Sequence, residues 1–217
     1  FITSTLQQTS SSMLGFSLSK TMKLAQDLYT GGYISYMRTD SPNISMLAQN
    51  NCKQYLLDTY GEAYSAPKNF AAKASNSQEA HEAIRPTDFF LNQELITDYD
   101  QKRLYNLILN RTIASQMKEA EIEKTSVKIL SSSSTEVFSA VGEVIKFDGF
   151  LKIYSASKEN DTEESKGILP DMQAKDKIEL VKMIATQKFS KPPFRFSEAS
   201  LVKLSLIHIS EPTRLSL

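Results

Sequence analysis

Apolar residues recur at helical spacing through the first thirty positions of the chain. This spacing predicts helices over residues 5–13 and 19–29, with Gly15 between them and a glycine pair at 31–32 after the second. The two segments have a helix-turn-helix outline. We interpret one apolar stripe of the second helix as its core face. That stripe consists of Leu18, Met22, Ala25, Leu28 and Tyr29.

The segment YISYM, residues 33–37, is rich in strand-favouring residues and too short for a helix. It predicts a brief extended stretch that Pro42 ends, because the residue before a proline avoids the α region. Another helix is predicted over residues 44–60, and a long one begins near Asp98, a good N-cap. The polar stretch 75–88 between them predicts irregular structure. One side of the long helix is expected to carry Leu104, Leu107, Ile108, Arg111, Ala114 and Met117.

The hydrophobic period changes from about 3.6 residues to two near Lys124. We therefore expect antiparallel strands from there to about Phe189, including KIELVKMIATQKF at 177–189, with Asp148–Gly149 as a hairpin turn. The acidic run 158–167 is expected to be a solvated loop. Ser197 is expected to cap a short helix over 198–204. The whole pattern predicts an α+β fold, helical to about residue 120 and β-rich after it.

Composition narrows the class of protein without naming a ligand. The 217 residues are 41% hydrophobic, as in globular proteins, and 25 basic residues balance 25 acidic ones, so any basic surface must be local. The single Cys52 excludes an internal disulfide or a cysteine zinc cluster and fits a reducing compartment. Apolar runs fall short of the roughly 18 residues of a membrane span, and no leader is recognisable. We therefore expect a cytoplasmic protein, and the start at Phe1 indicates a piece of a longer one.

A nucleophilic site is one interpretation of GGYISYMRTDSPNIS, residues 31–45. Tyrosine has a pKa of about 10, so its attack on a phosphodiester needs nearby positive charge and donors for the phosphoryl oxygens. In an extended segment residues i and i+2 face the same side, so Tyr36 and Arg38 can meet one phosphate. The Tyr-x-Arg spacing alone does not distinguish this site from a surface turn whose polar side chains have no catalytic role.

The joint pattern resembles the type IA DNA topoisomerases of the bacterial topoisomerase I branch. The run GYISYMRTDS at 32–41 resembles the active-site signature of that family, and QEAHEAIRP at 78–86 resembles a second one. FITSTLQQ at 1–8 and PPFRFSEASLVKL at 192–204 match two more, in family order. The resemblance implies an enzyme that cleaves and religates one DNA strand through a 5′-phosphotyrosine intermediate, without ATP, and so relaxes supercoils.

Site residues follow from the matching positions of these signatures. Tyr36 resembles the nucleophile, Arg38 the cation that binds the scissile phosphate, and His81 a histidine near that phosphate. The adjacent Tyr33 precedes the active-site signature, and we expect it to have a packing role. The resemblance also implies DNA contacts by further residues. These residues are Thr5, Gln7, Arg85 and Arg195, with Arg38 and His81.

The resemblance further implies a division of the chain into parts. Residues 1–122 would form the catalytic-tyrosine domain, 123–189 a β-rich hinge or gate segment, and 190–203 the start of a helical DNA-binding domain. In the family, Mg²⁺ is bound by a TOPRIM domain that precedes this region and that these residues do not contain. We therefore expect the chain alone to bind single-stranded DNA weakly, as a monomer, and not to relax supercoils.

The last residues depart from the family pattern. From Leu204 the chain reads LSLIHISEPTRLSL, which resembles the in-frame translation of a sequencing adaptor. We expect residues 204–217 to be an artefact that packs poorly, and we assign no function to His208 or Arg214.

Two other functions are compatible with parts of the sequence. In the first, the helix-turn-helix outline holds DNA while Tyr36 does no chemistry. In the second, the β-rich part only bridges other domains, although a bridge has no need for the set of Tyr36, Arg38 and His81. A covalent protein–DNA adduct that depends on Tyr36 distinguishes the enzyme from both.

Overall fold

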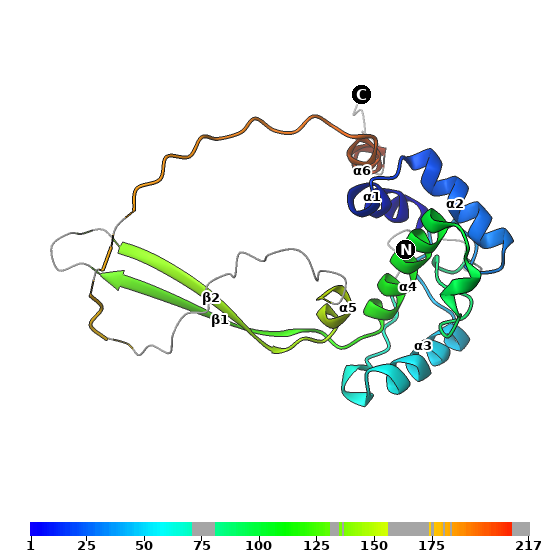
Figure 1. Ribbon diagram of the computed structural model, residues 1–217, viewed down its shortest axis with the longest axis horizontal. Helices are drawn as coiled ribbons and strands as arrows, with labels where there is room; N and C mark the ends of the chain where they lie inside the picture. Colours follow the sequence, from blue (N-terminus) through cyan, green and yellow to red (C-terminus); the bar gives the residue numbers. More distant parts are fainter. Residues whose placement is uncertain are drawn as a thin grey trace, which may run out of the picture. The chain divides into compact units, whose positions relative to one another are not determined.

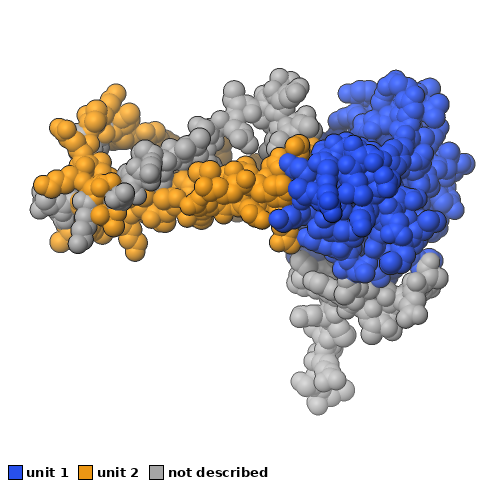
Figure 2. Space-filling model, turned by 90° about the horizontal axis from the view of Figure 1, so that it is seen from below, with its two compact units in different colours: residues 1–118, 195–217 blue, residues 119–194 orange. Residues whose placement is uncertain are grey.

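A computed structural model describes residues 1–70, 81–130, 135, 137–155, 174, 176–179, 181–182 and 184–209. These residues confirm the predicted α+β class, because the chain begins with helices and continues into an antiparallel pair of strands (Figure 1). The chain divides into two compact units (Figure 2). Unit 1 contains residues 1–118 together with those from Arg195 onward, and unit 2 contains residues 119–194.

Four of the longer helices of unit 1 lie close to their predicted positions, and the fifth, predicted over 198–204, continues to Ile209 into the stretch expected to be an artefact. They are α1 (Thr3–Leu14), α2 (Leu18–Thr30), α3 (Met46–Thr59), α4 (Tyr99–Ser115) and α6 (Glu198–Ile209). Two short 3-10 turns, η1 (Glu62–Tyr64) and η2 (Gln93–Leu95), lie between α3 and α4. Helix α1 packs against α2, α4 and α6, so residues from both ends of the chain meet in this unit (Figure 1).

Local capping explains where these helices begin and end. Asp98 accepts a hydrogen bond from the Gln101 N–H at 2.7 Å, as its predicted N-cap role requires. Ser45 caps α3 through the Ala48 N–H, and Ser197 caps α6 through the Ser200 N–H. Gly15 ends α1 in the left-handed conformation, with φ of 71°.

The core of unit 1 is wider than the predicted stripes. In α2 Ala25 and Leu28 are buried as expected, but Leu24 is buried too, and Tyr29 is exposed. Helix α4 buries apolar residues on more than one side, while Arg111 in its predicted stripe is exposed. The helix is enclosed by several neighbours, so a single-face pattern underestimates its burial. The fully buried members of the α4 core are Leu104, Tyr105, Ile108 and Ile113.

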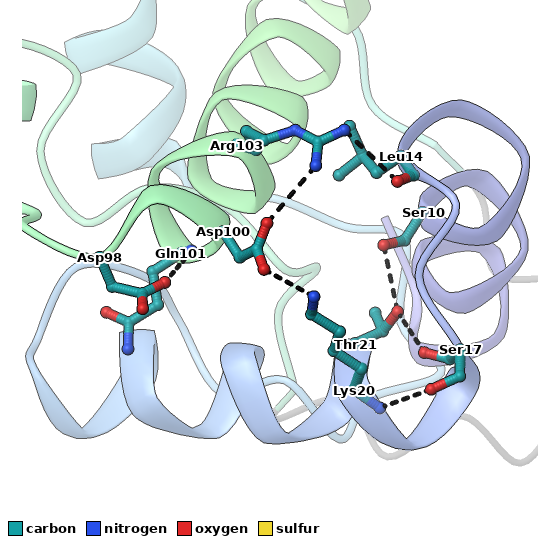
Figure 3. A network of polar contacts seen from close by, with 9 residues as sticks. All are labelled: Ser10, Leu14, Ser17, Lys20, Thr21, Asp98, Asp100, Gln101 and Arg103. Carbon is teal, nitrogen blue, oxygen red and sulfur yellow. Dashed lines mark hydrogen bonds and ion pairs between the residues drawn. The ribbon is translucent and has the colours of Figure 1, made fainter.

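A polar junction holds α1, α2 and α4 together (Figure 3). Asp100 accepts from Lys20 at 2.6 Å and from Arg103 at 3.4 Å. Arg103 also donates to the Leu14 carbonyl at 3.3 Å, at the C-terminus of α1. On the other side of α2, a buried hydrogen bond joins the hydroxyls of Thr21 and Ser10 at 3.1 Å. These contacts fix the start of α2 against both neighbouring helices.

Unit 2 is built on one antiparallel hairpin of β1 (Glu121–Leu130) and β2 (Val137–Phe147). The predicted turn at Asp148–Gly149 is wrong, because the last paired residues are Leu130 and Val137 and the connection falls on residues 131–136. Gly149 instead lies after β2 with φ of 49°, and the Leu151 N–H donates to the Asp148 carbonyl where α5 (Leu151–Ser155) begins.

The predicted strand at 177–189 is also wrong for the residues that the structure describes there. They are irregular, and apolar side chains such as Val181 and Ile184 are largely exposed. A strand needs a hydrogen-bonded neighbour, and the described residues of this stretch pair with neither outer edge of the two-stranded β1–β2 sheet. The strands therefore end at Phe147, and the acidic run 158–167 lies outside the described residues.

Among the described helices, none combines the length and the apolar character needed to cross a membrane.

Candidate active site

The glycine pair turns the chain sharply at the end of α2. Gly32 has φ of 75°, a left-handed conformation that glycine adopts without steric cost. A Cβ at Gly31 would lie 2.7 Å from the ring of Tyr33, so only glycine leaves room for this ring. The Tyr33 hydroxyl also donates to the Leu95 carbonyl at 3.4 Å. Tyr33 is thus held within the fold.

The segment that follows alternates between buried and exposed side chains. Met37, Thr39 and Ser41 are buried, with exposed fractions of 1%, 6% and 3%. Tyr36 is 44% exposed, and Arg38 is exposed as well. This two-residue alternation of burial matches the spacing predicted from the sequence, although the backbone bends at Met37 and Arg38 instead of forming a regular strand. It directs the phenol and the guanidinium away from the core.

Thr3, at the start of α1, holds the backbone on both sides of Arg38. Its hydroxyl donates to the Met37 carbonyl at 2.8 Å and accepts from the Thr39 N–H at 2.9 Å. The Thr3 N–H donates to the Thr39 carbonyl at 2.9 Å. Thr3 was not among the predicted site residues. The signal for it was the small hydroxyl-rich run TST in the first signature, which gave no indication of a partner.

The second signature runs beside the Tyr36 segment. Ser35 donates its N–H to the Arg85 carbonyl at 2.9 Å, and its hydroxyl donates to the Ala83 carbonyl at 2.8 Å. Ile34 and Pro86 form an antiparallel bridge. These bonds hold the residues directly after His81 against the residues directly before Tyr36. His81 itself is exposed.

The predicted catalytic side chains make no polar contacts with the described residues. Within the described part of the chain, Arg38 and His81 have no hydrogen-bond or ion-pair partner, and the Tyr36 hydroxyl has none either. The Tyr36 ring meets the edge of Tyr29, with ring centroids 5.3 Å apart and an interplanar angle of 70°. Such edge contacts stabilise one orientation of an aromatic ring. Sequence reasoning placed Tyr29 in the core stripe and missed this contact.

Arg85 differs from Arg38 because its side chain is used inside the fold. Its guanidinium pairs with Glu82 at 2.6 Å and donates to the Pro86 carbonyl at 3.0 Å. Burial opposes ionisation of Glu82, but hydrogen bonds from Arg85 and Ser45 outweigh it and lower the pKa of that carboxyl. The pair stays charged at neutral pH, and Arg85 is less available to DNA than the sequence suggested.

The other predicted DNA contacts are spread over the unit. Thr5 exchanges hydrogen bonds with the Ile2 backbone at 3.0 Å and so caps α1. Gln7 is half-buried in α1, and Arg195 is exposed shortly before α6. Contacts among the described residues join none of these three to Tyr36.

Other reactive chemistry is not supported by the described residues. Cys52 is buried, and burial raises the pKa of its thiol to about 12, so it remains a protonated, unreactive thiol. In the described ranges, no three histidine, cysteine or acidic side chains gather in a way that could hold a metal ion. The described residues therefore do not form a Mg²⁺ site of their own.

Comparisons with known proteins agree on one family. The family model described as DNA topoisomerase matches residues 1–205. DNA topoisomerase 1 of Pasteurella multocida is 45% identical over 206 residues, and that of Escherichia coli is 44% identical over 207. Each alignment covers 94% of this chain but only 23% of the relative's length. Full-length topoisomerase I from Thermotoga maritima superposes with a TM-score of 0.73 and 33% identity, over 95% of this chain and 34% of that one.

Proposed function

Because the chain belongs to the type IA DNA topoisomerase family, we propose that it is the part of a bacterial topoisomerase I that cleaves and reseals one DNA strand through Tyr36. The chain spans 23% of the length of its relatives, so the complete reaction needs residues outside it. Those residues would include the TOPRIM domain expected to bind Mg²⁺. The described residues offer no metal site, and we route no step through a metal here.

In the proposed reaction the Tyr36 hydroxyl oxygen attacks the scissile phosphorus. A bond forms between that oxygen and phosphorus, the bond from phosphorus to the 3′-oxygen breaks, and the 5′-phosphate stays on the tyrosine. The phenol loses its proton and the 3′-oxygen gains one, which requires an acid and a base beyond this chain. The phosphotyrosyl ester preserves the energy of the broken bond, so the 3′-hydroxyl can reverse the attack without ATP.

The observation that carries this proposal is the contrast between Tyr36 and Arg38 and their buried neighbours. Both side chains are exposed, whereas Met37 between them and Thr39 after Arg38 are buried. Neither has a polar partner in the described part of the chain. Folding an arginine so that its five donors remain free is expected where an external phosphate supplies the acceptors.

The roles proposed for the other predicted site residues follow from the family resemblance. We infer that His81 donates to the scissile phosphate or adds charge near it. We propose that single-stranded DNA on either side of the scissile phosphate contacts Thr5, Gln7 and Arg195. Arg85 is proposed to act chiefly within the protein, through its ion pair with Glu82. We infer that the protein acts as a monomer in the cytoplasm, where chromosomal DNA is its substrate.

Trapping of the covalent adduct tests the proposal. The full-length enzyme that carries this segment is incubated with an end-labelled single strand and denatured before electrophoresis. The wild type should retain label on the protein, and Tyr36→Phe should retain none, since phenylalanine keeps the ring and removes only the nucleophilic oxygen. A wild type that binds the strand without any adduct would favour a DNA-binding module without chemistry.

A further inference from the structure

Thr3 makes several hydrogen bonds to the backbone on both sides of Arg38. Besides the bonds to Met37 and Thr39 already described, its hydroxyl lies 3.0 Å from the Thr39 carbonyl. The bonds connect residues 34 and 36 positions apart in the sequence. One threonine at the start of α1 therefore determines where the backbone on either side of Arg38 lies.

The side chains on either side of Arg38 are buried, whereas that of Arg38 is not. Met37 and Thr39 are 1% and 6% exposed, so their backbone groups depend on partners within the protein. The Thr39 N–H finds its acceptor in the Thr3 hydroxyl. The Arg38 side chain has no polar partner in the described part of the chain, so its position depends on the backbone that carries it.

We propose that Thr3 is a positioning residue for DNA cleavage and that it acts through Arg38. This inference depends on the proposed function, in which the Arg38 guanidinium binds the scissile phosphate. A guanidinium contacts phosphate through two parallel N–H bonds, and small displacements of such a group cost much of its effect on the rate. Fixing the Met37 and Thr39 backbone holds Arg38 ready before the DNA arrives.

Thr3→Val is the most informative substitution. Valine has nearly the shape of threonine and the same branching at Cβ, so packing and helix propensity change little. It removes the hydroxyl and leaves the Thr39 N–H without its acceptor. The expected response is a local shift of the backbone at Thr39, which moves Arg38.

The experiment measures single-turnover cleavage and DNA binding with the full-length enzyme. Thr3→Val should slow cleavage about tenfold, equivalent to about 1.4 kcal/mol, while the affinity for a single strand changes less than about twofold. Thr3→Ser keeps the hydroxyl and should restore most of the rate. Thr9→Val is the matched control and should cleave normally, because Thr9 lies on the same helix and its hydroxyl makes no hydrogen bond to the described residues.

A double-mutant cycle separates positioning from a general structural effect. If Thr3 acts through Arg38, Thr3→Val should slow cleavage no further in an Arg38→Ala background. Equal slowing in both backgrounds, a normal rate for Thr3→Val, or a rate for Thr3→Ser as low as that of Thr3→Val would each overturn the proposal. Failure of the proposed function is recognised separately, because the wild type would then form no adduct that depends on Tyr36.

Discussion

Two arginines of the active-site signatures, Arg38 and Arg85, have different surroundings in the fold. Arg85 is tied to Glu82 and Pro86, whereas Arg38 has no polar partner in the described part of the chain. The sequence placed Tyr36 and Arg38 on one side of an extended segment, and the burial pattern agrees. It did not show that the Arg85 side chain is engaged inside the protein, because the Glu82 pairing depends on how residues 82–85 fold locally. The contribution of Thr3 was equally hidden, since its partners lie more than thirty positions away.

Arg38 should matter more for the rate of cleavage than for binding. Arg38→Ala removes a charged donor from the phosphate that becomes more negative in the transition state, so we expect cleavage to slow by about 10² to 10³. Arg38→Lys keeps the charge but loses the planar guanidinium, so its cleavage rate should lie between those of the wild type and Arg38→Ala. Rapid-quench measurement of adduct formation reports this order. Lys23→Ala, an exposed α2 position, serves as the control. A full rate for Arg38→Ala would contradict the assigned role.

The helices were predicted well wherever capping residues close in the sequence determine where a helix begins or ends. Asp98, Ser197 and Gly15 begin or end helices as expected, since caps act within one helical turn. The errors lie in unit 2, where strands depend on distant partners. The hairpin turn was assigned to Asp148–Gly149 on composition, and an exposed apolar segment at 177–189 was mistaken for a strand. Periodicity of two does not show whether a hydrogen-bonded neighbour exists.

The α1–α2–α4 junction should make stability depend on pH in the acid range. The hydrogen bond from Lys20, with that from Arg103, lowers the pKa of Asp100 below its ordinary value of 3.8. A carboxyl with a lowered pKa stabilises the fold above its unfolded pKa and loses that effect as the pH falls through the folded value. Asp100→Asn should therefore lower the melting temperature at pH 7 and in the range above about pH 4.

The difference between wild type and Asp100→Asn should shrink as the pH falls from 3.8 through the lower pKa of the folded Asp100 carboxyl, where that group takes up its proton. Melting curves of the 217-residue chain across this range measure it. Lys20→Met provides the matched test, because Asp100→Asn should cost less in its presence. A constant difference from pH 7 to pH 2 would show that the junction does not stabilise through the charge of Asp100.

At the scale of the whole chain, we expect the 217 residues alone to bind DNA but not to relax supercoils. The charges balance at 25 basic and 25 acidic residues, so only a few local cations can face DNA phosphates. We expect weak binding to single strands, with log affinity falling by roughly 0.7 per contacted phosphate for each unit of log salt. Fluorescence anisotropy at several salt concentrations gives this slope.

Supercoiled plasmid should remain unrelaxed by the chain alone, because proton transfer requires groups outside it. Relaxation by the bare chain would show that those groups are not needed.

The most direct test of the central claim is to locate the DNA on the protein. The full-length enzyme is trapped on a short single strand, digested with protease and nuclease, and sequenced by mass spectrometry. We expect a nucleotide linked through its 5′-phosphate to Tyr36, with Tyr29 and Tyr33 unmodified in the same digest. A nucleotide on Tyr33, on Tyr29 or on a residue outside this segment would contradict the assignment of Tyr36 as the nucleophile.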